Sequence, residues 1–139
     1  MQPRMQDIWK SYRSLPLWVQ IWVALILVPV NAAAFFLLDT WLGVAAAIAA
    51  AFVVLTNAPI MWVCRGMSRL MSVPHVFAWL PLQILIPLRL TGMVGSGSVS
   101  GAEWVFGIIL FLINGISLVF DVVDSWRWLR GEREVPGLE

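Results

Sequence analysis

The sequence predicts an all-α integral membrane protein: a four-transmembrane-helix bundle with an N-terminal interfacial helix and both termini cytoplasmic. Composition is the first reason, because 60% of the 139 residues are hydrophobic and only 12% are charged. Soluble domains are roughly 45–50% apolar and about 25% charged. The second reason is that the apolar residues fall into four runs, each near the ~20 residues that a helix needs to cross a bilayer. Residues 1–139 are therefore expected to form a single membrane domain.

The interfacial helix is predicted within residues 1–16. Apolar side chains recur there at spacings close to one helical face, and basic side chains lie among them. This pattern is typical of a helix that lies in the plane of a membrane surface. The apolar side chains are those of Met5, Ile8, Trp9 and Tyr12, and the basic ones are those of Arg4, Lys10 and Arg13.

The first span is expected at residues 17–38. Ser14 can cap a helix, and Pro16 suits the first turn, where its missing N–H costs nothing. The apolar run lacks a small-x-small cleavage site, so we interpret it as a retained span and not as a signal peptide. The second span is expected at residues 41–63. Only residues 39–40 separate the two spans, which predicts a tight antiparallel hairpin.

The third span is expected at residues 70–90, and a Gly/Ser-rich loop follows it. The spacing of Ser100 and Glu103 is that of a capping box, which marks the start of a helix. The fourth span is therefore expected at residues 104–123. Residues 124–139 are expected to leave the membrane as a cytoplasmic tail.

The positions of the basic residues predict the orientation. Loops rich in Lys and Arg stay on the cytoplasmic side of a membrane, and with both termini inside, eight of the nine basic residues lie there. They are Arg4, Lys10, Arg13, Arg65, Arg69, Arg127, Arg130 and Arg133. The exception is Arg89. A preference for Arg over Lys suggests a bacterium, so we expect a multi-pass protein of the inner membrane.

Each predicted span carries polar side chains that bilayer hydrocarbon rejects. A buried polar group without a partner is costly, so these side chains are expected to face the bundle interior. They are Asn31, Asn57, His75, Gln83, Asn114, Ser117 and Asp121. Counting about 1.5 Å per residue places Asn31 at the height of Gln83. The same count places Asn57 at the height of His75, with Asp121 about one turn nearer the cytoplasm.

Ion pairs are expected at both rims of the bundle. At the outer rim Arg89 lies at a height similar to that of Asp39 and Glu103, which explains the one basic residue on that side. At the inner rim two aspartates are expected to form salt bridges and not a metal site. The two aspartates are Asp121 and Asp124, and their expected partners are Arg127 or Arg65.

The residue content disfavours several kinds of chemistry. A single cysteine, Cys64, excludes an internal disulfide or a redox pair. A single histidine, His75, excludes a bis-histidine haem within one chain. The net charge of +1 does not suggest a nucleic-acid partner. We therefore expect no enzymatic activity, no metal and no cofactor.

The expected function is that of a non-enzymatic accessory, assembly or structural subunit of a membrane complex. Its expected partners are the lipid bilayer and either other membrane subunits or further copies of itself. One alternative is an oligomeric small-solute transporter or channel, with a polar path lined by Asn31, Asn57, Gln83 and Asn114. A second alternative is a pigment- or haem-binding membrane protein that uses His75. Amides inside membrane bundles commonly serve as contacts between helices, which favours the subunit.

Overall fold

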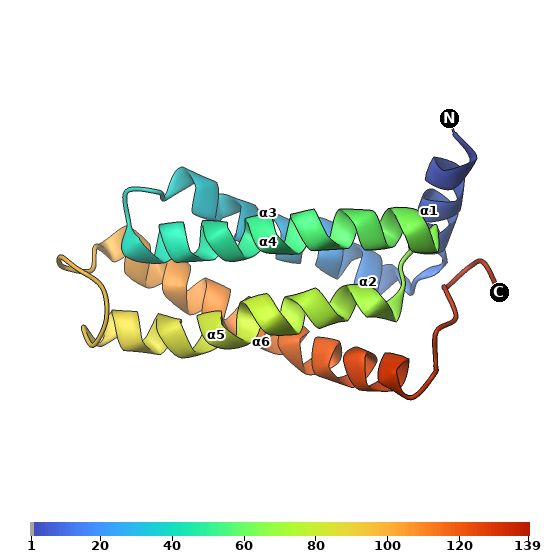
Figure 1. Cartoon of the computed structure of the whole chain (residues 1–139). Coiled ribbons are helices and arrows are strands. Elements are labelled where there is room, and N and C mark those ends of the chain that lie inside the picture. The colour runs from blue at the N-terminus through green and yellow to red at the C-terminus, as the bar shows by residue number, and fades with distance from the viewer. Residues whose placement is uncertain (1) are drawn as a thin grey trace.

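The computed structural model describes residues 2–139, and within that range the chain is helical without any β-strand (Figure 1). Four segments are long and apolar enough to cross a membrane: Leu17–Phe36, Trp41–Cys64, Arg69–Leu90 and Gly101–Leu129. The predicted all-helical fold with four such helices is confirmed, and it indicates a multi-pass membrane protein. Figure 1 shows both termini at one end of the bundle, called the terminal end below. The opposite loop end carries the turn at residues 39–40 and the loop of residues 91–100.

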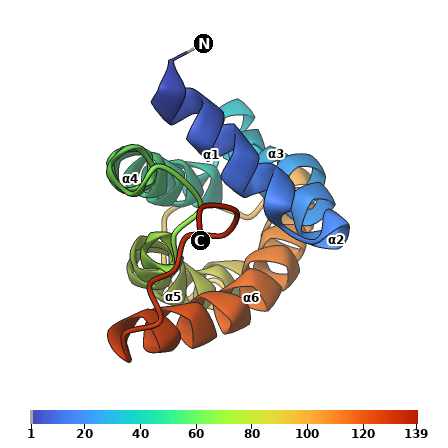
Figure 2. The same cartoon turned by 90° about the vertical axis from the view of Figure 1, so that its right-hand side faces the viewer.

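Helix α1 (Pro3–Ser14) lies across the terminal end, as the view along the bundle shows (Figure 2). It begins with proline, which suits the first turn of a helix. The buried Ser11 hydroxyl accepts a hydrogen bond from the Met67 N–H at 2.9 Å. The Tyr12 hydroxyl donates to the Gln20 carbonyl at 2.8 Å. These two bonds attach α1 to the start of the first span and to residues 65–68, which connect the second span to the third and are called the second-to-third link below.

The first span is a helix of changing pitch. It comprises α2 (Leu17–Ile21), a π-helical turn η1 (Trp22–Leu27), α3 (Val28–Ala32) and a 3₁₀ segment η2 (Ala33–Phe36). Pro29 explains the wide turn, because it cannot donate an N–H and its ring clashes with the preceding turn. The Val28 N–H instead bonds to the Val23 carbonyl, five residues back. The helix ends at Phe36, slightly before the predicted Leu38.

The second span is α4 (Trp41–Cys64). The Thr40 hydroxyl accepts the Gly43 N–H at 2.9 Å and so caps the first turn. Glycine is required at position 43, because a Cβ there would collide with the Leu37 carbonyl oxygen. At the other end, Arg65 adopts a left-handed backbone with φ of 61°, which terminates the helix.

The third span starts with a 3₁₀ turn, η3 (Arg69–Met71), which continues directly into α5 (Ser72–Leu90). The Ser68 hydroxyl accepts the Leu70 N–H at 3.1 Å and caps this start. Pro81 and Pro87 lie inside α5 without ending it.

The fourth span is α6 (Gly101–Leu129), which begins at the predicted cap: the Ser100 hydroxyl accepts the Glu103 N–H at 3.1 Å. Helix α6 continues past residue 123, where the span was expected to end, as far as Leu129. No proline interrupts this stretch, and the first glycine with positive φ after it is Gly131, at 97°. The predicted tail of residues 124–139 is therefore helical in its first part.

The best-packed part of the bundle lies in the half nearer the loop end. Helix α5 packs along both α4 and α6, and the first span contacts α4 through α3 and η2. The largest fully buried apolar side chains, Leu42, Ile86 and Leu110, belong to this half. At most 28% of the most apolar window of any span is buried within the chain. Most of the helix surface therefore faces outward, where lipid or another membrane protein can contact it.

Candidate functional site

An ion pair between Arg89 and Glu103 closes the loop end. Arg89 is 3% exposed and Glu103 is 1% exposed. The guanidinium donates from Nε to Oε2 at 3.0 Å and from Nη2 to Oε1 at 3.2 Å, the bidentate geometry that makes such pairs strong. Glu103 Oε2 also accepts the Leu42 N–H at 2.9 Å. Arg89 donates to the Gly97 and Ser98 carbonyls, so the pair joins α4, α5, α6 and the loop.

The structure brings together two of the three residues of the predicted outer-rim ion pair. Asp39 is exposed, and no ion pair in residues 2–139 includes it. Its position in the turn between the first two spans explains the difference, because a turn residue lies outside the helices whose inner faces meet at Glu103. Equal height along the bundle was therefore not sufficient to place Asp39 beside Arg89.

Asn31 and Asn114 form a reciprocal amide pair inside the bundle. The Nδ2 group of each donates to the Oδ1 atom of the other, at 2.8 Å and 3.0 Å. Asn114 is fully buried, and Asn31 also donates to the Leu27 carbonyl at 2.9 Å. The expected neighbour of Asn31 was Gln83 on the third span. The pairing differs because α3 packs against α6.

Gln83 contacts the backbone of α6. Its Nε2 group donates to the Phe111 carbonyl at 3.0 Å. Gly115 provides the space, since a Cβ at that position would lie 2.8 Å from Gln83 Nε2. The interior amides of the first, third and fourth spans are thus engaged in contacts between or within helices.

Asn57, His75 and Asp121 come together in the half nearer the terminal end, from α4, α5 and α6. His75 Nδ1 lies 2.7 Å from the Met71 carbonyl oxygen, and because a carbonyl can only accept, Nδ1 carries the proton. Nε2 is then an acceptor, 3.4 Å from Asn57 Nδ2. Asp121 Oδ1 lies 3.9 Å from His75 Nδ1. The Trp79 ring packs against the imidazole with 4.4 Å between centroids.

Three buried polar atoms of this cluster have no hydrogen-bond partner in the part of the chain that the structure describes. They are Asn57 Oδ1, Trp79 Nε1 and Asp121 Oδ2. Leaving a buried donor or acceptor unpaired costs about 1–3 kcal/mol. Additional hydrogen bonds, for example from water, would therefore be most stabilising at this cluster.

Two interior contacts were missed by the sequence analysis. Trp22 Nε1 donates to the Ser117 hydroxyl at 2.8 Å. The sequence indicated that Ser117 faces the interior, but nothing in the residue type of Trp22 indicated that its ring would reach Ser117. Gln20 is buried, and its Nε2 group donates to the Arg13 and Leu15 carbonyls. Its place on the same helical face as Asn31 was the available signal.

Arg69 joins three segments at the terminal end. Its Nε lies 3.8 Å from Asp124 Oδ1 on α6, and its Nη1 lies 3.4 Å from Glu134 Oε2 in the tail. The expected partners of Asp124 were Arg127 or Arg65. Arg127 instead binds Glu132 and Arg65 binds Asp7, while Arg69 reaches Asp124 because η3 packs against α6.

The remaining ion pairs of the terminal end are exposed. Arg65 Nε lies 3.1 Å from Asp7 Oδ2, which links α4 to α1. Arg127 Nη2 lies 3.1 Å from Glu132 Oε1. Hydrogen bonding to the Arg127 guanidinium holds the pKa of the Glu132 carboxyl below its usual range.

The tail after α6 folds back across the terminal end of the bundle toward α1 (Figure 2). A Cβ added to Gly66 would lie 2.6 Å from Val135 Cγ1. A Cβ added to Gly137 would lie 2.9 Å from the Ser14 hydroxyl and 3.2 Å from the Lys10 carbonyl oxygen. The tail, α1 and the second-to-third link thus cover this end together.

The outward face between α4 and α5 carries a groove of about 270 Å³, called the α4–α5 groove below. Small side chains, those of Ala45, Ala49 and Ala78, line it. Larger ones stand beside them, among them Phe52 and Phe77, which are both exposed. The groove is therefore an apolar hollow on the membrane-facing side of the bundle.

No family model, curated protein or solved structure matches this chain. Within residues 2–139 no three His, Cys, Asp or Glu side chains are placed to hold a metal ion. The structure thus contains the buried Arg89–Glu103 ion pair and the Asn31–Asn114 amide pair. It also contains the cluster around His75, with unpaired polar atoms, and the apolar α4–α5 groove on the outside.

Proposed function

We propose that this protein is a non-enzymatic accessory subunit that assembles with another membrane protein through helix contacts inside the bilayer. The α4–α5 groove carries the proposal. Helices in membranes associate by close packing on small residues, because lipid competes for any merely apolar surface. The alanines of the groove allow a further helix to approach, and Phe52 and Phe77 offer contact area on either side of it. A transmembrane helix of a partner is the occupant that fits this shape.

The interior contacts support a packing role over the two alternatives. The side-chain amides of Asn31 and Asn114 bind each other, so a solute that passes between them would have to break both hydrogen bonds. The buried Arg89–Glu103 ion pair would block the same path again at the loop end.

His75 Nε2 is the ring nitrogen that a haem or pigment metal would need, because Nδ1 carries the proton, and it faces Asn57 Nδ2 at 3.4 Å. This contact disfavours the use of His75 as a haem or pigment ligand. Transport retains support from the unpaired side-chain oxygens of Asn57 and Gln83, two of the residues expected to line its path.

Photo-crosslinking in intact membranes tests the proposed interface. A photoreactive amino acid in place of Phe77 should capture one defined transmembrane segment, because this side chain stands at the groove and is 71% exposed. The control carries the same photoreactive residue in place of Val119 on α6, which is 64% exposed and does not line the groove. We expect an adduct from position 77 and only lipid adducts from position 119.

The captured protein should also pass a reciprocal test. When the partner is tagged and purified in mild detergent, it should return this chain in a fixed ratio. An adduct with twice the chain mass would identify a second copy as the partner. The proposal fails when both positions capture the same mixture of proteins, or when neither captures any protein.

We also propose a bacterial inner-membrane location, with both termini cytoplasmic and α1 lying at the membrane interface. The basic residues support this orientation, because the terminal end carries all of them except Arg89. The exposed side chains of Met5 and Trp9 on α1 support interfacial placement, since apolar side chains of such a helix enter the boundary of the bilayer.

Labelling of introduced cysteines tests the orientation. In a Cys64→Ser background, a membrane-impermeant maleimide should label Ser98→Cys in cells whose outer membrane alone has been opened. It should label Glu139→Cys only after the inner membrane is opened as well. Both residues are exposed and end no helix, so neither change should disturb the bundle. Labelling of Glu139→Cys before the inner membrane is opened would contradict the proposed orientation.

A further inference from the structure

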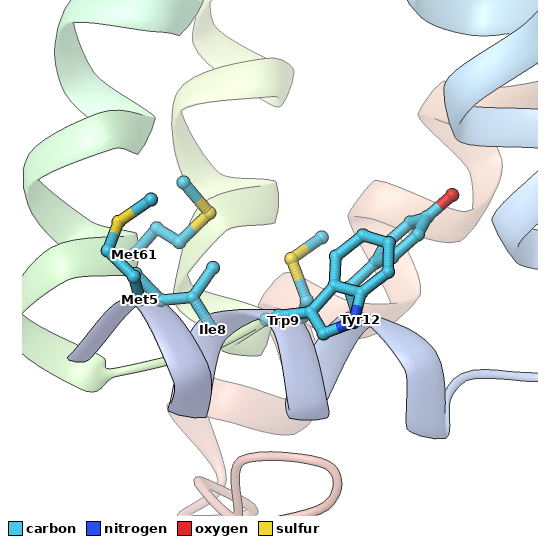
Figure 3. A pocket seen from close by; sticks show the side chains of 6 residues that line it. Met5, Ile8, Trp9, Tyr12 and Met61 are labelled. Atoms are coloured by element: carbon cyan, nitrogen blue, oxygen red, sulfur yellow. The ribbon is translucent and has the colours of Figure 1, made fainter. Parts of the chain in front are cut away.

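An apolar pocket of about 570 Å³ lies between α1 and the neighbouring end of α4 (Figure 3). In Figure 3 the labelled side chains of α1 rise from that helix toward the bundle, and the Met61 side chain reaches the same space from α4. The lining residues are Met5, Ile8, Trp9, Tyr12, Met61 and Met67. The volume falls within the roughly 300–1,000 Å³ typical of small-molecule sites.

The lining suits a flexible apolar chain. Three of its side chains are methionines, which are unbranched and adjust their shape to an occupant. The pocket also lies at the level of α1, where an interfacial helix meets the ends of the acyl-chain region. An acyl chain of the adjacent leaflet is therefore in reach of the pocket without leaving the membrane.

Two guanidinium groups flank the pocket. Arg4 donates from Nη1 to the Trp62 carbonyl at 2.8 Å, and its Cζ lies 5.7 Å from the centre of the Trp62 ring, next to Met61. The Arg13 Cζ lies 5.8 Å from the centre of the Trp9 ring, at the other end of the lining. At about 100° per residue, Arg4 and Arg13 fall on the two sides of the apolar face of α1.

Neither of these arginines has a carboxylate partner among the ion pairs of residues 2–139. Arg130 and Arg133 have none either, but only Arg4 and Arg13 lie beside the pocket. Arg13 is bonded only to a neutral group, the Gln20 Oε1 atom, at 3.1 Å. The pocket is therefore apolar inside and carries uncompensated positive charge at its edges.

We propose that this pocket binds an anionic phospholipid of the adjacent leaflet. One acyl chain lies among the methionines and aromatic rings, and the phosphodiester is bound by Arg4 or Arg13. The apolar lining alone would accept any lipid chain, and the two cations make the site selective for negative headgroups. This site is separate from the α4–α5 groove and does not depend on the proposed partner.

Native mass spectrometry of the full chain in mild detergent tests the site. The probe is an equimolar mixture of phosphatidylglycerol and phosphatidylcholine with identical acyl chains. We expect selective retention of phosphatidylglycerol by the wild type. The double variant Arg4→Gln/Arg13→Gln should lower this retention about 30-fold, which is about 2 kcal/mol at about 1 kcal/mol per basic residue near anionic lipid.

A matched control removes the same charge elsewhere at the terminal end. Arg130 and Arg133 are exposed and line no part of the pocket, so Arg130→Gln/Arg133→Gln should keep the selectivity. Glycerol 3-phosphate, which offers an anionic phosphate without an acyl chain, should not displace the lipid. If the first double variant does not fold, Arg4→Lys/Arg13→Lys keeps both charges and should still retain phosphatidylglycerol.

Four outcomes would overturn the proposal. They are equal retention of both lipids by the wild type, no retention of either, equal losses in the two glutamine double variants, and displacement by glycerol 3-phosphate.

Discussion

Glu103→Gln should lower the free energy of unfolding by about 3–5 kcal/mol, the usual cost of removing one partner of a buried ion pair. The substitution leaves the Arg89 guanidinium buried without a counter-charge. Glutamine retains a side-chain oxygen that can still accept the Leu42 N–H. The loss of stability therefore reports the missing charge and not a missing hydrogen bond to Leu42. Denaturant titration of the purified protein in detergent micelles, followed by far-ultraviolet circular dichroism, measures the change.

The matched control for this prediction is Glu132→Gln. It removes the carboxylate of another Arg–Glu pair, which is exposed to solvent. Exposed pairs contribute little because water and salt screen them, so the unfolding curve should move far less. In addition, Arg89→Met/Glu103→Met should recover much of the stability that Glu103→Gln loses, since an apolar pair leaves no buried charge. Equal shifts for Glu103→Gln and Glu132→Gln would show that the pair at the loop end is not buried as described.

Gly43→Ala should destabilise the protein at the upper end of the roughly 1–3 kcal/mol that overpacking typically costs. The new methyl group would collide with the Leu37 carbonyl oxygen, which is fixed backbone and cannot rotate away. The Thr40 hydroxyl lies within 2.7 Å of the same methyl position and would lose its capping geometry. The same denaturant titration measures this effect.

Gly101→Ala provides the comparison for Gly43→Ala. Gly101 begins α6, and no atom lies within 4 Å of a Cβ built there. Alanine has a higher helix propensity than glycine, by up to about 1 kcal/mol, so Gly101→Ala should leave stability unchanged or raise it slightly. If Gly43→Ala were tolerated as well as Gly101→Ala, the turn between the first two spans could not be as tight as the structure has it.

The helices could be predicted from sequence because their determinants are local. Runs of apolar residues set the spans, and Ser100 with Glu103 marked the start of α6 by spacing alone. The continuation of α6 to Leu129 was missed because a drop in hydropathy at Asp124 ends a membrane span but does not end a helix. The wide turn before Pro29 was missed because the sequence shows where a proline interrupts a helix but not how the backbone adjusts.

The interior pairs could be predicted only in part, because they depend on which helices are neighbours. Height along the bundle placed His75 near Asn57 and Arg89 near Glu103. It also suggested Gln83 for Asn31, whereas the packing of α3 against α6 selects Asn114. The pocket beside α1 and the α4–α5 groove each form only where separate helices pack together. No local pattern could show either hollow.

The contacts between the tail and α1 also impose an order on biosynthesis. At about 5–20 residues per second, Gly137 leaves the ribosome roughly 6–25 s after Ser14, which it contacts in the finished protein. During that interval all four spans can already be inserted while the terminal end still lacks its cover. The nascent α1 can by then contact the first span and the end of α4, but it cannot yet contact the tail. The cover of the terminal end therefore forms only after the four long helices have been synthesised.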